Sequence, residues 1–305
     1  MRSHHHDHDD QHEHGREHGH GHGHQHGHHA AAGNGEAAMA EILDLDAEVM
    51  HAYMSEVTAW IGELTADAPP RRILDLGSGT GTGTFALLRR FGRADAVALD
   101  VSSDMLRHLA ERARELGLAD RIRTVQADLD AEWPALDPVD LVWASSSLHH
   151  MADPDRVLAD VFATLRPGGL LVVAEMESFP RFLPDDLGIG RPGLEARCKA
   201  VLDERRIAVH PHFGSDWGSR LTKAGFAIED ERTSAIELTP PLPPATGRYA
   251  QASLRRLRSG LDGVLSADDL ATLDVLLDGD GPASLLRRDD LTVRTTRTVW
   301  AARRP

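Results

Sequence analysis

The sequence is poor in the features that mark disulfide-bonded or membrane-spanning proteins. Cys198 is the only cysteine, so no intrachain disulfide can form, which is consistent with a reducing compartment. No apolar run approaches the ~18 residues that a membrane span requires, and the N-terminus lacks the apolar region of a signal peptide. We therefore expect a cytoplasmic protein that makes no use of a membrane.

Positive charge and aromatic residues are also scarce. The formal net charge is −15, and aromatic residues make up 5% of the 305 residues. Because nucleic acids are bound through basic patches, we expect no nucleic-acid partner. Hydrophobic residues still amount to 41%, which is enough for the core of one α/β domain with insertions.

The first 35 residues differ in composition from the rest of the chain. Residues 4–29 contain 13 of the 19 histidines, among Gly, Asp, Glu and Gln, with almost nothing apolar. Such a segment cannot bury enough surface to offset the ordering of its backbone, so we expect 1–35 to be disordered, with a linker at 30–35. Imidazole is a common ligand of divalent transition metals, and we expect metal binding at this tail only. The candidate ligands are His20, His22, His24, His26 and His28.

A glycine-rich turn follows the first apolar run of the remaining chain. Residues 73–76 suit a strand that is buried on both faces of a parallel sheet, and 84–88 have helical spacing. Gly77, Gly79 and Gly81 lie between them and allow a sharp turn and the close approach of a ligand. This order of strand, glycine loop and helix is where open α/β sheets bind nucleotide-like ligands.

The loop does not fit the dinucleotide pattern Gly-x-Gly-x-x-Gly. The sixth position is Thr82 when counted from Gly77 and Thr84 when counted from Gly79. This speaks against an NAD-dependent oxidoreductase, which remains an alternative. A second alternative is a non-catalytic metal-binding protein that uses the α/β domain as a scaffold.

Two further acids stand at the ends of apolar runs. Asp100 ends the run at 96–99, and Asp128 follows the run at 122–127. One such Asp usually forms a turn or caps a helix. Acids beyond successive strands, next to a glycine loop, indicate a ligand site, and a carboxylate such as Asp100 can accept hydrogen bonds from ribose hydroxyls.

Together these motifs resemble those of the class I S-adenosylmethionine-dependent methyltransferases of small-molecule type. Motif I of that family, Asp/Glu-x-Gly-x-Gly-x-Gly, matches residues 75–81, and the segments 140–150 and 165–174 match its later landmarks in order. The resemblance implies an α/β fold with a seven-stranded Rossmann-like sheet in the order 3-2-1-4-5-7-6, with the last strand antiparallel. It also implies S-adenosylmethionine as the methyl donor.

The resemblance further implies a set of donor-binding residues and a domain plan. In the family, the position of Asp128 pairs with the adenine amino group, and the loop after the fourth strand faces the methyl group. The methyltransferase domain would span 36–305, with a core at 70–178 and helical lid insertions at about 179–214 and 239–290. The donor-binding candidates are Asp75, Gly77, Ser78, Gly79, Asp100, Val101, Met105, Asp128, Leu129 and Ser145.

With such a donor, the protein mainly has to hold the acceptor in line with the methyl group. Proximity and orientation of this kind can lower the activation barrier by about 7–11 kcal/mol. A base is needed only where the acceptor loses a proton. His149 and His150 follow the fourth strand and are the catalytic candidates; His210 and His212 are weaker ones.

We expect a small-molecule acceptor because the chain has acidic charge and no Asn-Pro-Pro-aromatic motif after the fourth strand. Apolar residues in and next to the first insertion favour a partly apolar metabolite, although several of them must serve the core, and the atom that is methylated stays open. These residues are Phe179, Phe182, Leu183, Phe213 and Trp217.

The remaining elements follow from periodicity and capping. Mixed spacings of three and four predict a helix over 36–64 that is broken once, and Ser266 with Asp269 forms a capping-box pattern. Further helices are expected at 194–206, 216–224 and 245–257, and strands at 226–237 and 291–301.

Overall fold

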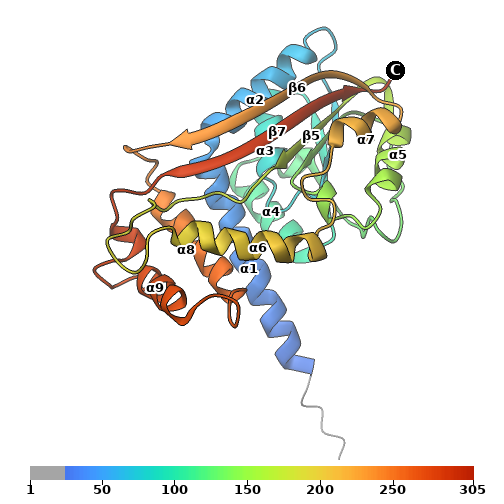
Figure 1. The fold of residues 1–305 in the computed structure, drawn as a ribbon. Coiled ribbons are helices and arrows are strands. Elements are labelled where there is room, and N and C mark those ends of the chain that lie inside the picture. Colours follow the sequence, from blue (N-terminus) through green and yellow to red (C-terminus); the bar gives the residue numbers. More distant parts are fainter. Residues whose placement is uncertain (1–24) are drawn as a thin grey trace, which may run out of the picture.

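The structure of the protein is a computed structural model that describes residues 25–305, with side chains described for 35–205 and 210–305. It contains one twisted sheet with helices on both faces and a second group of helices beyond one end of the strands (Figure 1). The strands are β1 (Arg72–Leu76), β2 (Asp95–Asp100), β3 (Ile122–Gln126), β4 (Val139–Ser145), β5 (Leu165–Met176), β6 (Ala227–Leu238) and β7 (Val293–Arg303).

The seven strands pair in the order β3-β2-β1-β4-β5-β7-β6. Strands β1 to β5 are parallel to one another, and β7 is antiparallel to both β5 and β6. This confirms the predicted fold class and strand order. The carboxyl ends of β1, β2, β4 and β5 therefore lie along one rim of the sheet, where α/β proteins bind their ligands.

Alternate residues of the central strands enter two different cores. Leu74 of β1 faces a cluster that includes residues of α5 (Pro154–Thr164) and α7 (Trp217–Lys223). Ile73 faces the opposite cluster, which includes residues of α2 (His51–Leu64) and α3 (Thr82–Arg90). This alternation is the expected consequence of the two-residue period of a strand, and it explains why the run at 73–76 is apolar throughout except for Asp75.

The N-terminal helical region differs from its prediction. α1 (Gln25–Val49) runs through 30–35, where the sequence predicts a linker, and α2 follows after a break at Met50. The predicted single break is thus confirmed, whereas the predicted linker is wrong. Of the candidate metal ligands, His20, His22 and His24 lie outside the described residues. His26 and His28 belong to α1, but their side chains are outside the description.

The two insertions and the end of α1 form a third core beyond the carboxyl rim (Figure 1). It contains residues of α6 (Leu194–Val209), α8 (Thr246–Ser259) and α9 (Ala267–Leu277), together with Leu45 and Val49 of α1. We call α1, 177–214 and 239–292 the lid region. The helix α4 (Ser103–Glu115) packs instead on β2 and β3.

The start of α9 has the predicted cap. The Ser266 hydroxyl accepts a hydrogen bond from the backbone N–H of Asp269 at 3.2 Å, as predicted. The carboxylate of Asp269 also interacts with the side chain of Ser266. It is buried and accepts hydrogen bonds from Arg191 at 2.8 Å and from Arg197 at 2.7 and 2.9 Å, so it joins α9 to α6 and the loop before it.

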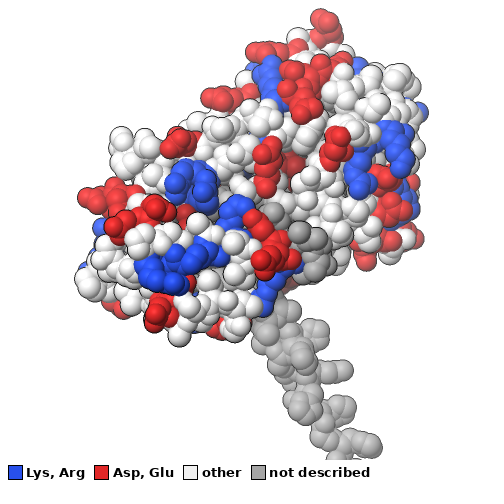
Figure 2. Space-filling model, in the orientation of Figure 1, with Lys and Arg blue, Asp and Glu red and all other residues white. Residues whose placement is uncertain are grey.

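The surface carries charges of both signs. Figure 2 shows acidic and basic side chains interspersed over the face that it draws. Within the part of the chain that the structure describes, no helix is both long and apolar enough to cross a bilayer.

Candidate active site

The glycine loop is held against the strands on both sides of β1. The N–H groups of Gly77 and Ser78 donate to the carbonyl of Leu99 at 2.8 and 2.9 Å. Gly77 has a φ of +69°, and a Cβ at this position would lie 2.5 Å from the Cβ of Ser147. Glycine is therefore required here, and the loop after β1 touches the loop after β4.

Asp100 joins the glycine loop to the start of α4. One carboxylate oxygen accepts a hydrogen bond from the N–H of Gly79 at 2.8 Å, and the other accepts one from the N–H of Ser102 at 2.9 Å. Each carboxylate oxygen has a second acceptor position, so both can still receive a ribose hydroxyl. Val101 comes next and is 62% exposed, which leaves an apolar surface beside the acid. These residues fit an adenosyl group.

The remaining donor-binding candidates lie at the same rim. Asp128 is exposed, and one of its oxygens accepts a hydrogen bond from the N–H of Asp130 at 2.9 Å. Met105 and Leu129 are buried, and Ser145 is half-buried at the end of β4. The carboxylate and the apolar side chains are of the kinds that an adenine ring needs, and direct contact with it stays a prediction.

Asp75 has a structural environment unlike that of the other two acids. It is 2% exposed, and its carboxylate accepts a hydrogen bond from the Thr84 hydroxyl at 2.5 Å, which ties β1 to α3. Burial raises the pKa of Asp75 to about 7, against the opposing effect of the hydrogen bond from Thr84. Its predicted contact with the donor stays a prediction.

The loop after β4 is strained and contains unsatisfied polar groups. Ser146 adopts a φ of +50°, which is unusual for a residue other than glycine, and its N–H donates to the carbonyl of Ala174 at 2.8 Å. The hydroxyls of Ser147, Ser78 and Thr80 are buried and have no hydrogen-bond partner within the described part of the chain. Since buried polar groups normally have partners, these orphaned hydroxyls are consistent with a polar ligand at the two adjoining loops.

His149 and Glu175 form a buried pair beside this loop. His149 lies in η2 (Leu148–His150), and its Nδ1 is 2.6 Å from Oε2 of Glu175 at the end of β5. Both residues are 5% exposed. Glu175 was not among the residues predicted from the sequence. It could have been found by the criterion that identified Asp100 and Asp128, because it directly follows the apolar run of the fifth strand at 170–174.

The other histidines surround His149 at increasing distance. The ring of His150 has its centroid 4.2 Å from that of His149, and His210 lies 4.8 Å from His150 and 6.1 Å from His149. Desolvation is the main cause that lowers the pKa of His150 to about 4, and electrostatic repulsion from His149, His210 and Arg256 lowers it further. His212 instead lies near Arg220, whose guanidinium is 3.2 Å from Nδ1 of His212.

Two phenylalanines of the first insertion lie next to His149. The ring of Phe213 stands edge-on to His149 with centroids 5.0 Å apart, and Phe179 lies 5.9 Å from Phe213 with 48% of its surface exposed. Phe182 is buried in the lid core, as is Leu183, and Trp217 is buried against the sheet. The predicted apolar acceptor surface is thus reduced to Phe179 and Phe213.

Helix α1 covers the glycine loop. Cδ1 of Leu43 lies 3.0 Å from the position that a Cβ of Gly79 would take, and Asp44 accepts a hydrogen bond from Nε2 of His108 on α4 at 2.8 Å. Tyr53 is buried in the sheet core, and burial raises its pKa to about 12.

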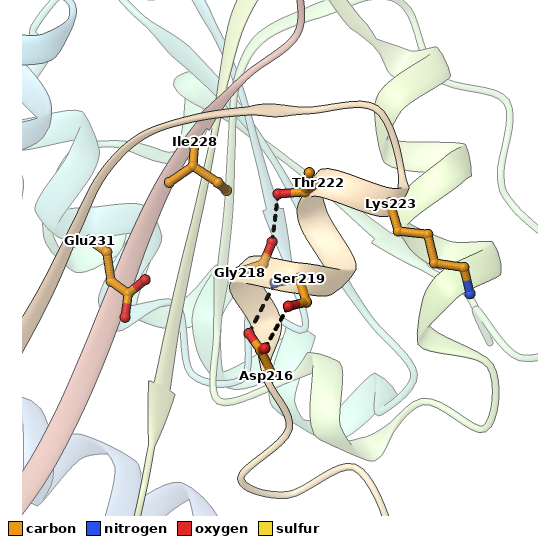
Figure 3. Close-up of a pocket in the computed structure, with 7 residues that line it drawn as sticks. All are labelled: Asp216, Gly218, Ser219, Thr222, Lys223, Ile228 and Glu231. Carbon is orange, nitrogen blue, oxygen red and sulfur yellow. Dashed lines mark hydrogen bonds between the residues drawn. The ribbon is translucent and has the colours of Figure 1, made fainter.

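A surface pocket of about 580 Å³ lies away from this rim, between α7 and β6. Figure 3 shows the hydroxyl and N–H of Ser219 bonded to Asp216, and the hydroxyl of Thr222 bonded to the carbonyl of Gly218. None of the predicted site residues lines this pocket. A second pocket, of about 410 Å³, lies at the amino ends of β1, β2 and β3. Neither position is where open α/β sheets bind ligands.

The sheet order and the rim define the class of the protein. It is an α/β domain with a glycine loop and Asp100 at the carboxyl ends of β1 and β2, and with a histidine–carboxylate pair at the carboxyl ends of β4 and β5. Residues 73–169 match the family model described as a methyltransferase domain. These residues therefore form a methyltransferase domain, and the sheet has the strand order that the resemblance to the class I S-adenosylmethionine-dependent methyltransferases implies.

Curated relatives cover only part of the chain. Malonyl-[acyl-carrier protein] O-methyltransferase of Laribacter hongkongensis (strain HLHK9) is 33% identical over 175 residues, which is 56% of this chain and 55% of the relative. Methyltransferase GfsG of Streptomyces halstedii is 36% identical over 174 residues, 57% of this chain and 59% of the relative. The chain thus spans little more than half the length of these relatives.

Among solved structures, a candidate methyltransferase from Bacillus halodurans C-125 shares the fold. The TM-score is 0.50 at 17% identity, covering 80% of this chain and 98% of that one.

Proposed function

We propose that the protein transfers a methyl group from S-adenosylmethionine to a small-molecule acceptor by in-line displacement. The observation that carries the proposal is the contact between Gly77 and Ser147, because it makes the donor-binding loop adjoin the turn that holds His149. The family match and the free acceptor positions of Asp100 support the choice of donor.

Each group at the rim has a role in this proposal. Asp100 receives the ribose hydroxyls, Asp128 pairs with the adenine amino group, and Val101 covers one face of the base. When bound, S-adenosylmethionine supplies a methyl group that is already activated as a sulfonium. His149 takes a proton from acceptors that must lose one. His150 is the poorer base, since a pKa of about 4 gives it little driving force for proton abstraction near neutral pH.

The lid region is proposed to close the acceptor side of the site. It lies beyond the carboxyl rim and brings Phe213 to His149, so that an acceptor would be enclosed between the insertion and the loop after β4. Exclusion of water at this point strengthens the electrostatic interactions of the site.

Calorimetry with S-adenosylmethionine and with NAD tests the choice of donor. We expect heat of binding with the first and none with the second; the reverse result would indicate an oxidoreductase. The acceptor is then sought by incubating the protein with an isotopically labelled methyl donor and a metabolite extract, followed by mass analysis. If the donor binds but no compound gains a label from any extract, the domain is a scaffold and not an enzyme.

A further inference from the structure

The pairing of His149 with Glu175 determines where the imidazole holds its proton. When Glu175 is ionised, its carboxylate can only accept hydrogen bonds, so in that state Nδ1 of His149, at 2.6 Å from Oε2, is the nitrogen that carries the proton. Nε2 then has a free lone pair and can act as a base. A buried carboxylate in this position plays the same part as the third member of a catalytic triad, which orients the base and does not itself react.

The burial of this pair is costly and is incompletely compensated. Glu175 is 5% exposed, and its second oxygen, Oε1, has no hydrogen-bond partner within the described residues. The other groups that face His149 are His150 from the same turn and His210 and Phe213 from the segment after α6. The hydrogen bond with His149 partners the other carboxylate oxygen, Oε2, so a change at either residue alters the environment of the other.

The need for a base distinguishes between acceptor classes. A neutral amine attacks with its own lone pair, and a carboxylate is already deprotonated at neutral pH. A hydroxyl is a weak nucleophile until its proton is removed, so it is the acceptor that gains most from an oriented imidazole.

We propose that Glu175 is a positioning residue for His149 and that the protein methylates a hydroxyl oxygen; this rests on the proposed function. The O–H bond breaks and its proton goes to Nε2 of His149. The oxygen forms a bond to the methyl carbon while the carbon–sulfur bond breaks, and the electron pair of that bond stays on sulfur, which becomes a neutral thioether.

The surroundings of His149 also indicate what bears the hydroxyl. Phe213 stands against the imidazole, and the half-exposed ring of Phe179 continues the same apolar surface. The acceptor class is therefore a hydroxyl compound with an apolar, ring-containing framework, because flat apolar groups pack well against aromatic side chains.

The tautomer of His149 can be tested without donor or acceptor. Nitrogen-15 NMR of the full chain, with the His149 signals assigned by comparison with His149→Gln, should show the proton on Nδ1 and a free Nε2. In Glu175→Gln the amide can donate as well as accept, so a second population with the proton on Nε2 should appear. Glu177→Gln, two residues further along the chain and exposed, is the matched control and should leave the signals unchanged. An unchanged His149 tautomer in Glu175→Gln overturns the positioning role.

Product analysis tests the acceptor class. The labelled compound from the metabolite extract should be a methyl ether, and Glu175→Gln should lower its rate of formation by on the order of 100-fold, with little change in the acceptor KM and none in donor affinity. A methyl ester, an N-methyl or a C-methyl product overturns the assignment of a hydroxyl while leaving the methyltransferase proposal intact. Failure of the donor to bind removes the methyltransferase proposal, whereas the NMR result then still decides the role of Glu175.

Discussion

The donor side of the site and the lid region are built in different ways. On the donor side, the glycine loop and Asp100 lie close in sequence, and each follows directly from the strand before it. In the lid region, the core is assembled from α1, from the segment after β5 and from the segment after β6, which are far apart along the chain. A short motif can therefore identify the first, whereas only packing between distant segments defines the second.

The proposed acceptor side lies where these two regions meet. His149 and Glu175 come from the sheet, and Phe179 and Phe213 come from the first insertion. We therefore expect substitutions on the donor side to change donor affinity and substitutions in the lid core to change stability. Substitutions where the two regions meet, which we call the junction, should change turnover of the acceptor.

The largest effect is expected from His149→Gln, which can keep a hydrogen bond to Glu175 but has no basic nitrogen. Loss of a general base lowers kcat by about 10²–10⁴-fold. Steady-state kinetics with the identified acceptor measure this, and donor affinity by calorimetry should be unchanged. Full turnover of this variant at neutral pH would remove the base from the mechanism.

Asp269→Asn should weaken the lid core without affecting donor binding. The buried carboxylate binds Arg191 and Arg197, and loss of its charge should lower the free energy of unfolding by about 1–3 kcal/mol. Cys198 is the single thiol and is buried in this core, so its reaction rate with a thiol reagent reports opening of the lid region. The exposed Asp268→Asn is the control. Equal thiol reactivity in both variants would contradict a role for Asp269 in closing this core.

Asp75→Asn should change how stability depends on pH. The folded pKa of Asp75, about 7, lies above its ordinary value of 3.8, so the stability that this group contributes is present in full below pH 3.8 and is lost as pH rises through 7. The amide of the variant does not titrate and would have no such dependence. Urea unfolding at pH 5 and pH 8 should therefore show wild type losing roughly 2–4 kcal/mol relative to the variant, since each pKa unit corresponds to about 1.4 kcal/mol. Parallel curves for the two proteins would show that Asp75 is ionised throughout.

Asp100→Asn should weaken donor binding by roughly 10- to 100-fold, because hydrogen bonds to a charged group contribute about 1.5–3 kcal/mol. Calorimetric titration with S-adenosylhomocysteine measures the change. Asp104→Asn is the matched control, since Asp104 is exposed and pairs with Arg107 on α4. If the two variants bind equally well, Asp100 does not hold the ribose.

The smallest effect is expected from Phe179→Ala. Removing a half-exposed ring at the junction should raise the acceptor KM by about 3- to 10-fold, corresponding to roughly 1 kcal/mol of apolar contact. The donor affinity should stay the same. Val275→Ala, at a similarly exposed position on α9, should leave both constants unaltered. An effect on donor affinity instead would place Phe179 on the other side of the site.

The predictions that the structure narrowed have a common cause. Phe182 and Trp217 were among the apolar residues considered for the acceptor surface, and both are buried in cores. The carboxylate of Asp269, predicted as part of a capping box, also accepts hydrogen bonds from two arginines that precede it by more than seventy residues. In each case the residue type was read correctly and its partner came from a distant segment.

Short motifs and their succession along the sequence were sufficient to predict the class of fold, the acids at the strand ends and, through the family resemblance, the strand order. These features depend on the two-residue period of strands and on the glycine turn, which act between near neighbours. The pairing of His149 with Glu175 and the burial of Asp75 were decided only when the chain folded. The reason is physical: strands β4 and β5 must pair before residues 26 positions apart can share a proton, and no local pattern specifies that contact.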